Sequence, residues 1–138
     1  LLPNADAGSE AIRQVLIEQQ QAGQLHLATH LPRREFVSWM AAAELMVGNS
    51  SAGIIEAASF GTPVVNIGLR QNLRERNANV FDSPAEPHAI ARTLQRALGH
   101  GRFPVENVYG DGATAPRIVE RLATQPLDAQ LLLKTNAY

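Results

Sequence analysis

The sequence has 138 residues, of which 45% are hydrophobic, 18% charged and 5% aromatic. This length and composition are typical of one globular domain with a core of its own. The net charge of −1 argues against nucleic acid held by a general basic surface, although a local arginine cluster can still bind a small anion. Nucleic acid is therefore not an expected partner.

Cysteine is absent, which excludes disulfides, a cysteine nucleophile and thiolate metal ligands. Glu44 interrupts the most apolar run, WMAAAELMV, so no segment reaches the roughly 18 to 20 apolar residues of a membrane span. We therefore expect no membrane partner and a cytoplasmic location. The sequence starts at Leu1 without an initiator methionine or a signal sequence, so we expect it to begin partway through a longer protein.

Strands and helices are expected to alternate along the first half of the chain. Leu1 and Leu2 resemble the end of a buried strand, and Ser9 resembles the N-cap of a helix that Gly23 closes. The elements expected next are a strand at residues 25–30, a helix at 33–43 and a buried strand at 44–48.

The second half continues this alternation. A helix is expected from about Ser51 to Ser59, with Gly61 at its end, and Pro87 is expected to open another helix. The pattern predicts an α/β fold with a Rossmann-like, doubly wound parallel sheet. The remaining elements expected are strands at 63–68 and 79–82, helices at 87–100 and 116–123, and a tail at 125–138 that is either a final helix or a loosely held end. We assign residues 1–124 to the Rossmann-like domain.

The stretch VGNSSAG, residues 47–53, follows a predicted strand and precedes a predicted helix. In parallel α/β sheets ligands bind beyond the carboxyl ends of the strands, and a helix start offers backbone N–H groups and about half a positive charge to an anion. Ser50 and Ser51 add hydroxyl donors, while Gly48 and Gly53 allow a close backbone approach. The residues alone leave two interpretations open: a diphosphate site, or only a turn and a helix cap.

Glu56 is a single carboxylate in a helix of small apolar residues. With Ser50 or Ser51 as the N-cap, it lies beyond the third helical position and cannot complete a capping box. One interpretation is that it binds the ribose hydroxyls beside a diphosphate. The other is structural, either as the third residue of a helix capped by Gly53 or as a partner of Arg70.

Three arginines follow the next predicted strand, at positions 70, 74 and 76. Guanidinium groups bind phosphate oxygens through two parallel hydrogen bonds, so this cluster can close the second side of an anion site. We expect Arg70, nearest to the strand end, to contribute; the alternative is an ordinary solvated loop. The four histidines lack metal-ligand spacing, and Asp111 in YGDG is explained at least as well by a turn as by catalysis. No metal or cofactor is predicted.

Taken together, these motifs resemble the UDP-N-acetylglucosamine 2-epimerase family. They are, in order, PNADAGS (3–9), HLP (30–32), GNSSAGIIEAASFGTPVVNIGLRQ (48–71), R-x-x-N-V (76–80) and YGDGATAPRI (109–118). The NSS and GLRQ segments resemble the hydrolysing branch, which releases N-acetylmannosamine and UDP. The non-hydrolysing branch typically has an S-G-G loop and a T-E-R-P segment there, and both are absent.

The resemblance implies a two-domain enzyme of the glycosyltransferase-B shape, with this chain as its C-terminal, nucleotide-binding half. By the same resemblance, the serines hold the diphosphate, Glu56 binds the ribose hydroxyls and Arg70 lies at the UDP site. Asn4 also contacts the nucleotide, and the backbone around Leu31 faces the uracil. The UDP-binding residues that we predict are Asn4, Leu31, Ser50, Ser51, Gly53, Glu56 and Arg70.

The reaction that the resemblance implies is elimination of UDP to a glycal, followed by addition of water with inversion at carbon 2. Its acid/base residues belong, by the same resemblance, to the missing N-terminal half and the hinge region, so we expect no catalytic residue here and no turnover by the isolated chain. The expected partners are UDP or a UDP-amino sugar and that N-terminal domain. The expected pathway is amino sugar metabolism that supplies sialic acid precursors. The full enzyme can also be a homo-oligomer. The pattern also fits the UDP-sugar-binding half of a glycosyltransferase, or a non-catalytic nucleotide-binding module.

Overall fold

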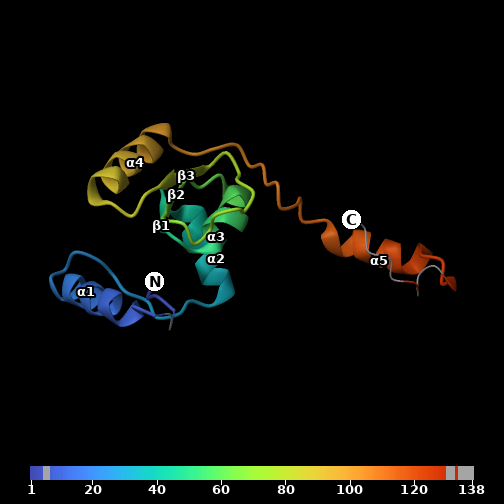
Figure 1. The fold of residues 1–138 in the computed structure, drawn as a ribbon, viewed down its shortest axis with the longest axis horizontal. Helices are drawn as coiled ribbons and strands as arrows, with labels where there is room; N and C mark the ends of the chain where they lie inside the picture. Colours follow the sequence, from blue (N-terminus) through green and yellow to red (C-terminus); the bar gives the residue numbers. More distant parts are fainter. Residues whose placement is uncertain (5–6, 130–132, 134–138) are drawn as a thin grey trace. The chain divides into compact units, whose positions relative to one another are not determined.

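The computed structural model describes residues 1–4, 7–129 and 133. Two compact units divide the chain, Leu1–Ala43 and Glu44–Tyr138. Figure 1 gives the order of the elements. The predicted tail at 125–138 falls mostly outside the described residues, and the predicted domain boundary at residue 124 stays a prediction. In the part of the chain that is described, no helix has the length and apolarity needed to cross a membrane.

The first unit contains α1 (Ser9–Gln21) and α2 (Arg33–Ala42). The predicted Ser9 N-cap is wrong by one position, because the capping residue is Gly8, with a left-handed φ of 82°. Glycine adopts this conformation without the steric cost that a Cβ imposes, so it can turn the chain into the helix. Gly23, with φ +71°, follows the end of α1 as predicted.

The strands predicted at residues 1–2 and 25–30 are not formed. Leu2 N donates to Ala28 O at 3.0 Å, so the two segments lie side by side. One such bond is not a ladder, and a strand needs a hydrogen-bonded partner along its length. The alternation of apolar residues therefore predicted extended chain here but not a strand.

The second unit contains a parallel sheet in the order β1-β2-β3, which confirms the predicted α/β class. Register places Asn66 of β2 between Gly48 of β1 and Asp82 of β3, so the carboxyl ends of all three strands meet at one edge. The strands are β1 (Met46–Gly48), β2 (Val64–Ile67) and β3 (Val80–Ser83).

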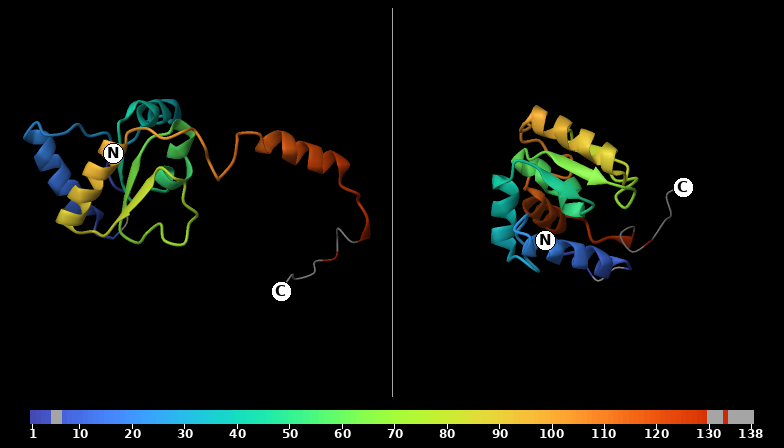
Figure 2. Two further views of the ribbon diagram at one scale, coloured as in Figure 1. Left: turned by 90° about the horizontal axis from the view of Figure 1, so that it is seen from above. Right: turned by 90° about the vertical axis from the view of Figure 1, so that its left-hand side faces the viewer.

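Helices cover both sides of this sheet. The helix predicted between β1 and β2 is formed in two pieces, α3 (Ser51–Ile55) and the 3-10 helix η1 (Ala57–Phe60). α4 (Pro87–His100) begins at Pro87, as predicted, and follows β3. α3 contacts β1 and β2, whereas α4 contacts β2 and β3 from the opposite side (Figures 1 and 2). α5 (Thr114–Thr124) has no buried residue.

The core of the second unit lies around β2. Val64, Val65 and Asn66 are successive and all buried, and because successive side chains point to opposite faces, both faces of β2 are covered. A Cβ added at Gly53 would lie only 2.8 Å from Val64 Cγ1, so α3 packs closely on the face that carries Val64. Small residues after β1 therefore permit this close approach of helix and sheet.

Candidate functional site

The junction after β1 begins α3 directly beyond the carboxyl end of the strand. Ser50 is the N-cap, and its Oγ accepts a hydrogen bond from Ala52 N at 3.3 Å. Ser50 O also accepts from Gly53 N at 3.2 Å, while Ser51 is the first helical residue. The capping interpretation is therefore confirmed for Ser50. The backbone N–H groups that would face an anion at this position include those of Ala52 and Gly53, which donate to Ser50.

The structure excludes one of the structural interpretations of Glu56, in which Gly53 caps the helix and Glu56 is its third residue. Gly53 lies inside α3, which excludes a helix capped by Gly53. Glu56 follows α3 and precedes η1, six positions after the Ser50 cap, so it cannot complete a capping box, as predicted. The residue is half-buried and its Oε2 atom is buried. The Glu56 carboxylate is therefore partly removed from solvent.

The loop after β2 reaches back to the junction after β1. Gln71 is 4% exposed, and its Nε2 donates to Asn49 O at 2.8 Å. Arg70 is exposed, and its Nη1 lies 3.5 Å from the same carbonyl oxygen. Both side chains thus link the two loops at the carboxyl edge of the sheet. The structure brings Arg70 beside Asn49, which directly precedes Ser50.

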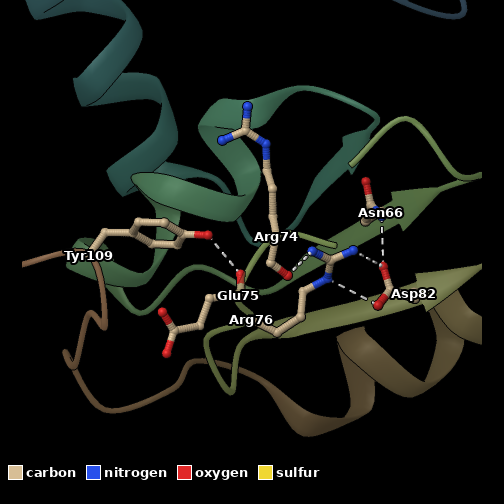
Figure 3. A network of polar contacts seen from close by, with 6 residues as sticks. All are labelled: Asn66, Arg74, Glu75, Arg76, Asp82 and Tyr109. Atoms are coloured by element: carbon tan, nitrogen blue, oxygen red, sulfur yellow. Dashed lines mark hydrogen bonds and ion pairs between the residues drawn. The ribbon is translucent and has the colours of Figure 1, made fainter. Parts of the chain in front are cut away.

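The other two arginines have different surroundings. Arg76 donates from Nε to Asp82 Oδ2 at 3.1 Å and from Nη2 to Asp82 Oδ1 at 3.3 Å, while its Nη1 donates to Arg74 O at 2.7 Å. Figure 3 shows the Arg74 side chain extending away from Asp82. Tyr109 Oη also donates to Glu75 O, at 2.9 Å, which adds a second attachment for this loop (Figure 3). The three arginines therefore do not form one cluster, and Arg76 holds the loop against β3.

Asp82 is the acceptor at the centre of this network. Asn66 Nδ2 donates to its Oδ1 at 2.7 Å, from the neighbouring strand. Partial burial raises the pKa of Asp82, but the hydrogen bonds from Arg76 and Asn66 and the guanidinium charge outweigh it and leave the pKa below its ordinary value. Asp82 is therefore ionised at neutral pH and acts as a structural anion here.

Asp111 belongs to a turn. Its Oδ1 accepts from Ala113 N at 3.0 Å and from Arg117 Nη1 at 2.9 Å, at the start of α5. The hydrogen bond from Arg117, with that from Ala113 N, lowers the pKa of Asp111 far below its usual range. Of the two interpretations of this residue, the geometry supports the turn.

Asn4 and Leu31 lie in the first unit. Asn4 is exposed, Leu31 is half-buried, and the Leu2–Ala28 hydrogen bond holds their two segments side by side. The roles of these two residues, and of the five predicted in the second unit, in binding a nucleotide stay predictions. The second unit brings together the junction after β1 and Arg70, and Glu56 directly follows the end of α3.

Sequence reasoning missed a group of carboxamides, of which all but Asn107 are buried. Asn79 Nδ2 donates to Thr62 O at 2.7 Å, and Asn77 donates to the C-terminal end of α3. A signal was present, because a polar residue inside the β-branched run VVNI and two asparagines in RNANV are unusual for buried segments. The missed residues are Asn66, Gln71, Asn77, Asn79 and Asn107.

The second unit has a parallel sheet with a helix that starts at the carboxyl end of a strand, and polar side chains link two loops at that edge. This arrangement is that of a Rossmann-like domain. Residues 1–123 match the model of the family described as UDP-N-acetylglucosamine 2-epimerase. The chain belongs to this family, as its motifs predicted.

Curated relatives agree with this assignment. All 138 residues are 46% identical to a Legionella pneumophila protein named UDP-N,N'-diacetylbacillosamine 2-epimerase (hydrolyzing), and cover 37% of it. A stretch of 115 residues, 83% of the chain, is 34% identical to a Neisseria meningitidis UDP-N-acetylglucosamine 2-epimerase and covers 30% of it. A Campylobacter jejuni GDP/UDP-N,N'-diacetylbacillosamine 2-epimerase (hydrolyzing) is 39% identical over 82 residues, which are 58% of this chain and 21% of that protein. The chain thus spans about a third of the length of the first two relatives.

Proposed function

We propose that this chain is the C-terminal, UDP-binding domain of a hydrolysing 2-epimerase that acts on a UDP-amino sugar in the cytoplasm. The observation that carries the proposal is the junction after β1, where a Ser50-capped helix starts at the carboxyl end of a strand in a chain of this family. Helix N–H groups favour a diphosphate at such a position, and Ser51 adds a hydroxyl. Arg70 supplies a guanidinium beside the same junction.

Glu56 is the residue proposed to bind the ribose. A carboxylate near a diphosphate is unfavourable unless ligand donors meet it, and the two ribose hydroxyls are such donors. The other proposed contacts are Asn4 with the nucleotide and the Leu31 backbone with the uracil. Gly53 contributes by allowing α3 to approach β2.

Calorimetric titration with UDP, UMP and GDP tests the site. Glu56→Ala is expected to weaken UDP binding about ten- to a hundredfold, the equivalent of roughly 1.5 to 3 kcal/mol for a charge-assisted hydrogen bond. Ser51→Ala leaves the Ser50 cap in place, so a loss of UDP affinity in this variant reports on the ligand rather than on the helix. Glu120→Ala, in α5, is the matched control. Absence of UDP binding, or an equal loss in the Glu56 and Glu120 variants, would reject the assignment.

The activity of the whole protein is part of the same proposal. The acid/base residues belong to the N-terminal domain, so the 138-residue chain is expected to bind UDP without turnover. The names of the Legionella and Campylobacter relatives contain "hydrolyzing", which supports the hydrolysing reaction. Epimerase activity of this chain alone would contradict the expected lack of turnover. Acceptor-dependent release of UDP by the full protein would favour glycosyl transfer instead.

A further inference from the structure

The chain changes helix type at Glu56. α3 ends at Ile55 and η1 begins at Ala57, with Glu56 at φ −109° and ψ −37°. Ser59 N donates to Glu56 O at 3.0 Å, three residues back, rather than to Ile55 O as in a continuous α-helix. The break therefore removes the usual helical donor of the Ile55 carbonyl.

Two asparagine side chains supply donors at this break. Asn77 Nδ2 donates to Ile54 O at 3.1 Å, and Asn107 Nδ2 donates to Ile55 O at 2.8 Å. Asn107 Nδ2 also lies 2.8 Å from Ser59 Oγ, on the far side of the break. The pair thus bonds to the last carbonyls of α3, and Asn107 also reaches η1.

The orientation of both carboxamides is fixed by backbone groups. Asn77 Oδ1 accepts from Val108 N at 2.8 Å, and Asn107 Oδ1 accepts from Tyr109 N at 3.0 Å. The two side chains also bond each other, from Asn77 Nδ2 to Asn107 Oδ1 at 3.3 Å, and Asn77 is only 4% exposed. Because each oxygen is occupied by a donor, each nitrogen must face the helix break.

We infer that Asn77 and Asn107 are positioning residues for Glu56, and this inference rests on the proposed function. A 3-10 helix has about 3.0 residues per turn against about 3.6 in an α-helix, so a break at Glu56 changes the direction in which its side chain leaves the backbone. By bonding the carbonyls on the α3 side and Ser59 on the η1 side, the asparagines keep the break at this residue. The partly buried Glu56 carboxylate is thereby held in one direction, and the proposed function assigns the ribose to it.

The test compares UDP with the UDP analogue that lacks both ribose hydroxyls, by calorimetry on the 138-residue chain. The wild-type chain is expected to prefer UDP about ten- to a hundredfold, and Asn107→Ala to reduce this preference to about threefold or less. Asn79→Ala is the control, because Asn79 is a carboxamide that likewise donates to a backbone carbonyl, but at Thr62. This control is expected to keep the preference. A full preference in Asn107→Ala would overturn the inference.

Two further measurements separate this inference from the proposed function. If the wild-type chain and Glu56→Ala show the same lack of preference, the ribose role of Glu56 fails, and the break is then tested without ligand. Amide hydrogen exchange at Ser59 is expected to be about tenfold faster in Asn107→Ala than in wild type, and unchanged in Asn79→Ala. Unchanged exchange in Asn107→Ala rejects the positioning role. If Asn107→Ala does not fold, Asn107→Asp replaces it, because aspartate keeps the acceptor and removes the donor. Asn107→Asp must then give the same faster exchange at Ser59.

Discussion

The loops after β1 and β2 are linked at the same edge of the sheet, yet different forces fix them. After β1 the chain enters α3 at once, and Gly53 lies so close to Val64 that a methyl group does not fit. After β2 the loop is mostly exposed, and hydrogen bonds from Gln71 and Arg76 attach it to its surroundings. The helix that follows β1 is therefore sensitive to added volume, and the loop after β2 to charge and pH.

The largest effect is expected at Gly61, which caps the end of η1 in the connection between β1 and β2. Gly61→Ala would place a Cβ against the carbonyl oxygen of Phe103, at a left-handed φ of 63°. Overpacking and backbone strain together should lower the free energy of unfolding by about 3 kcal/mol or more, measured by urea denaturation. Gly99→Ala is the control, because Gly99 lies in α4 with open space around it and should gain roughly 0.5 to 1 kcal/mol. Equal effects at both glycines would contradict the packing argument.

A direct comparison comes from Gly53, in the helix that follows β1, and Gly68, in the loop after β2. Gly53→Ala adds a Cβ 2.8 Å from Val64 Cγ1, in a buried position, and should cost about 2 kcal/mol of stability by overpacking. Gly68→Ala adds a Cβ in open space at φ +73°, so only backbone strain of about 1 kcal/mol is expected. Thermal and urea denaturation of both variants measure the difference. A larger cost at Gly68 would reverse the comparison.

Local signals predicted many features of the fold, and distant contacts explain what they missed. Ser50, Gly61 and Pro87 were placed correctly, because caps, turns and helix starts depend on neighbouring residues. The break at Glu56 was not predicted, since its donors lie 23 and 52 positions away from the carbonyls that they bond. The strand expected at residues 25–30 is not formed, for a related reason. Alternation of apolar residues is a property of one segment, whereas a strand requires a second segment that hydrogen bonds with it along its length.

A smaller, pH-dependent effect is expected at Asp82. Its pKa is lowered in the folded chain, so the ionised form stabilises the fold above the unfolded pKa, and this contribution is lost as pH falls through the lower folded value. Asp82→Asn should therefore lower stability at pH 7 by about 0.5 to 1 kcal/mol, because the side chain is largely exposed and solvent screens the ion pair with Arg76.

Urea denaturation of wild type and Asp82→Asn across pH measures this contribution. The difference between the two should shrink as the pH falls below roughly 4. Asp82 also accepts a hydrogen bond from Asn66, on the neighbouring strand. A stability difference that grows as the pH falls would mean that Arg76 does not stabilise the ionised carboxylate.

The smallest effect is expected at Leu73, and it has the opposite sign. Leu73 is 98% exposed in the loop after β2, and its φ is +65° although it is not a glycine. Leucine has a Cβ penalty in this left-handed region and no buried contact to offset it, whereas asparagine tolerates the region better. Leu73→Asn should therefore raise the free energy of unfolding by about 0.5 kcal/mol. Leu69→Asn, at an exposed neighbour in the same loop that lacks the positive φ, should leave stability unchanged. If Leu73→Asn destabilised the chain, the side chain of Leu73 would have to make contacts that stabilise the loop, and the loop after β2 would then depend on packing like the loop after β1.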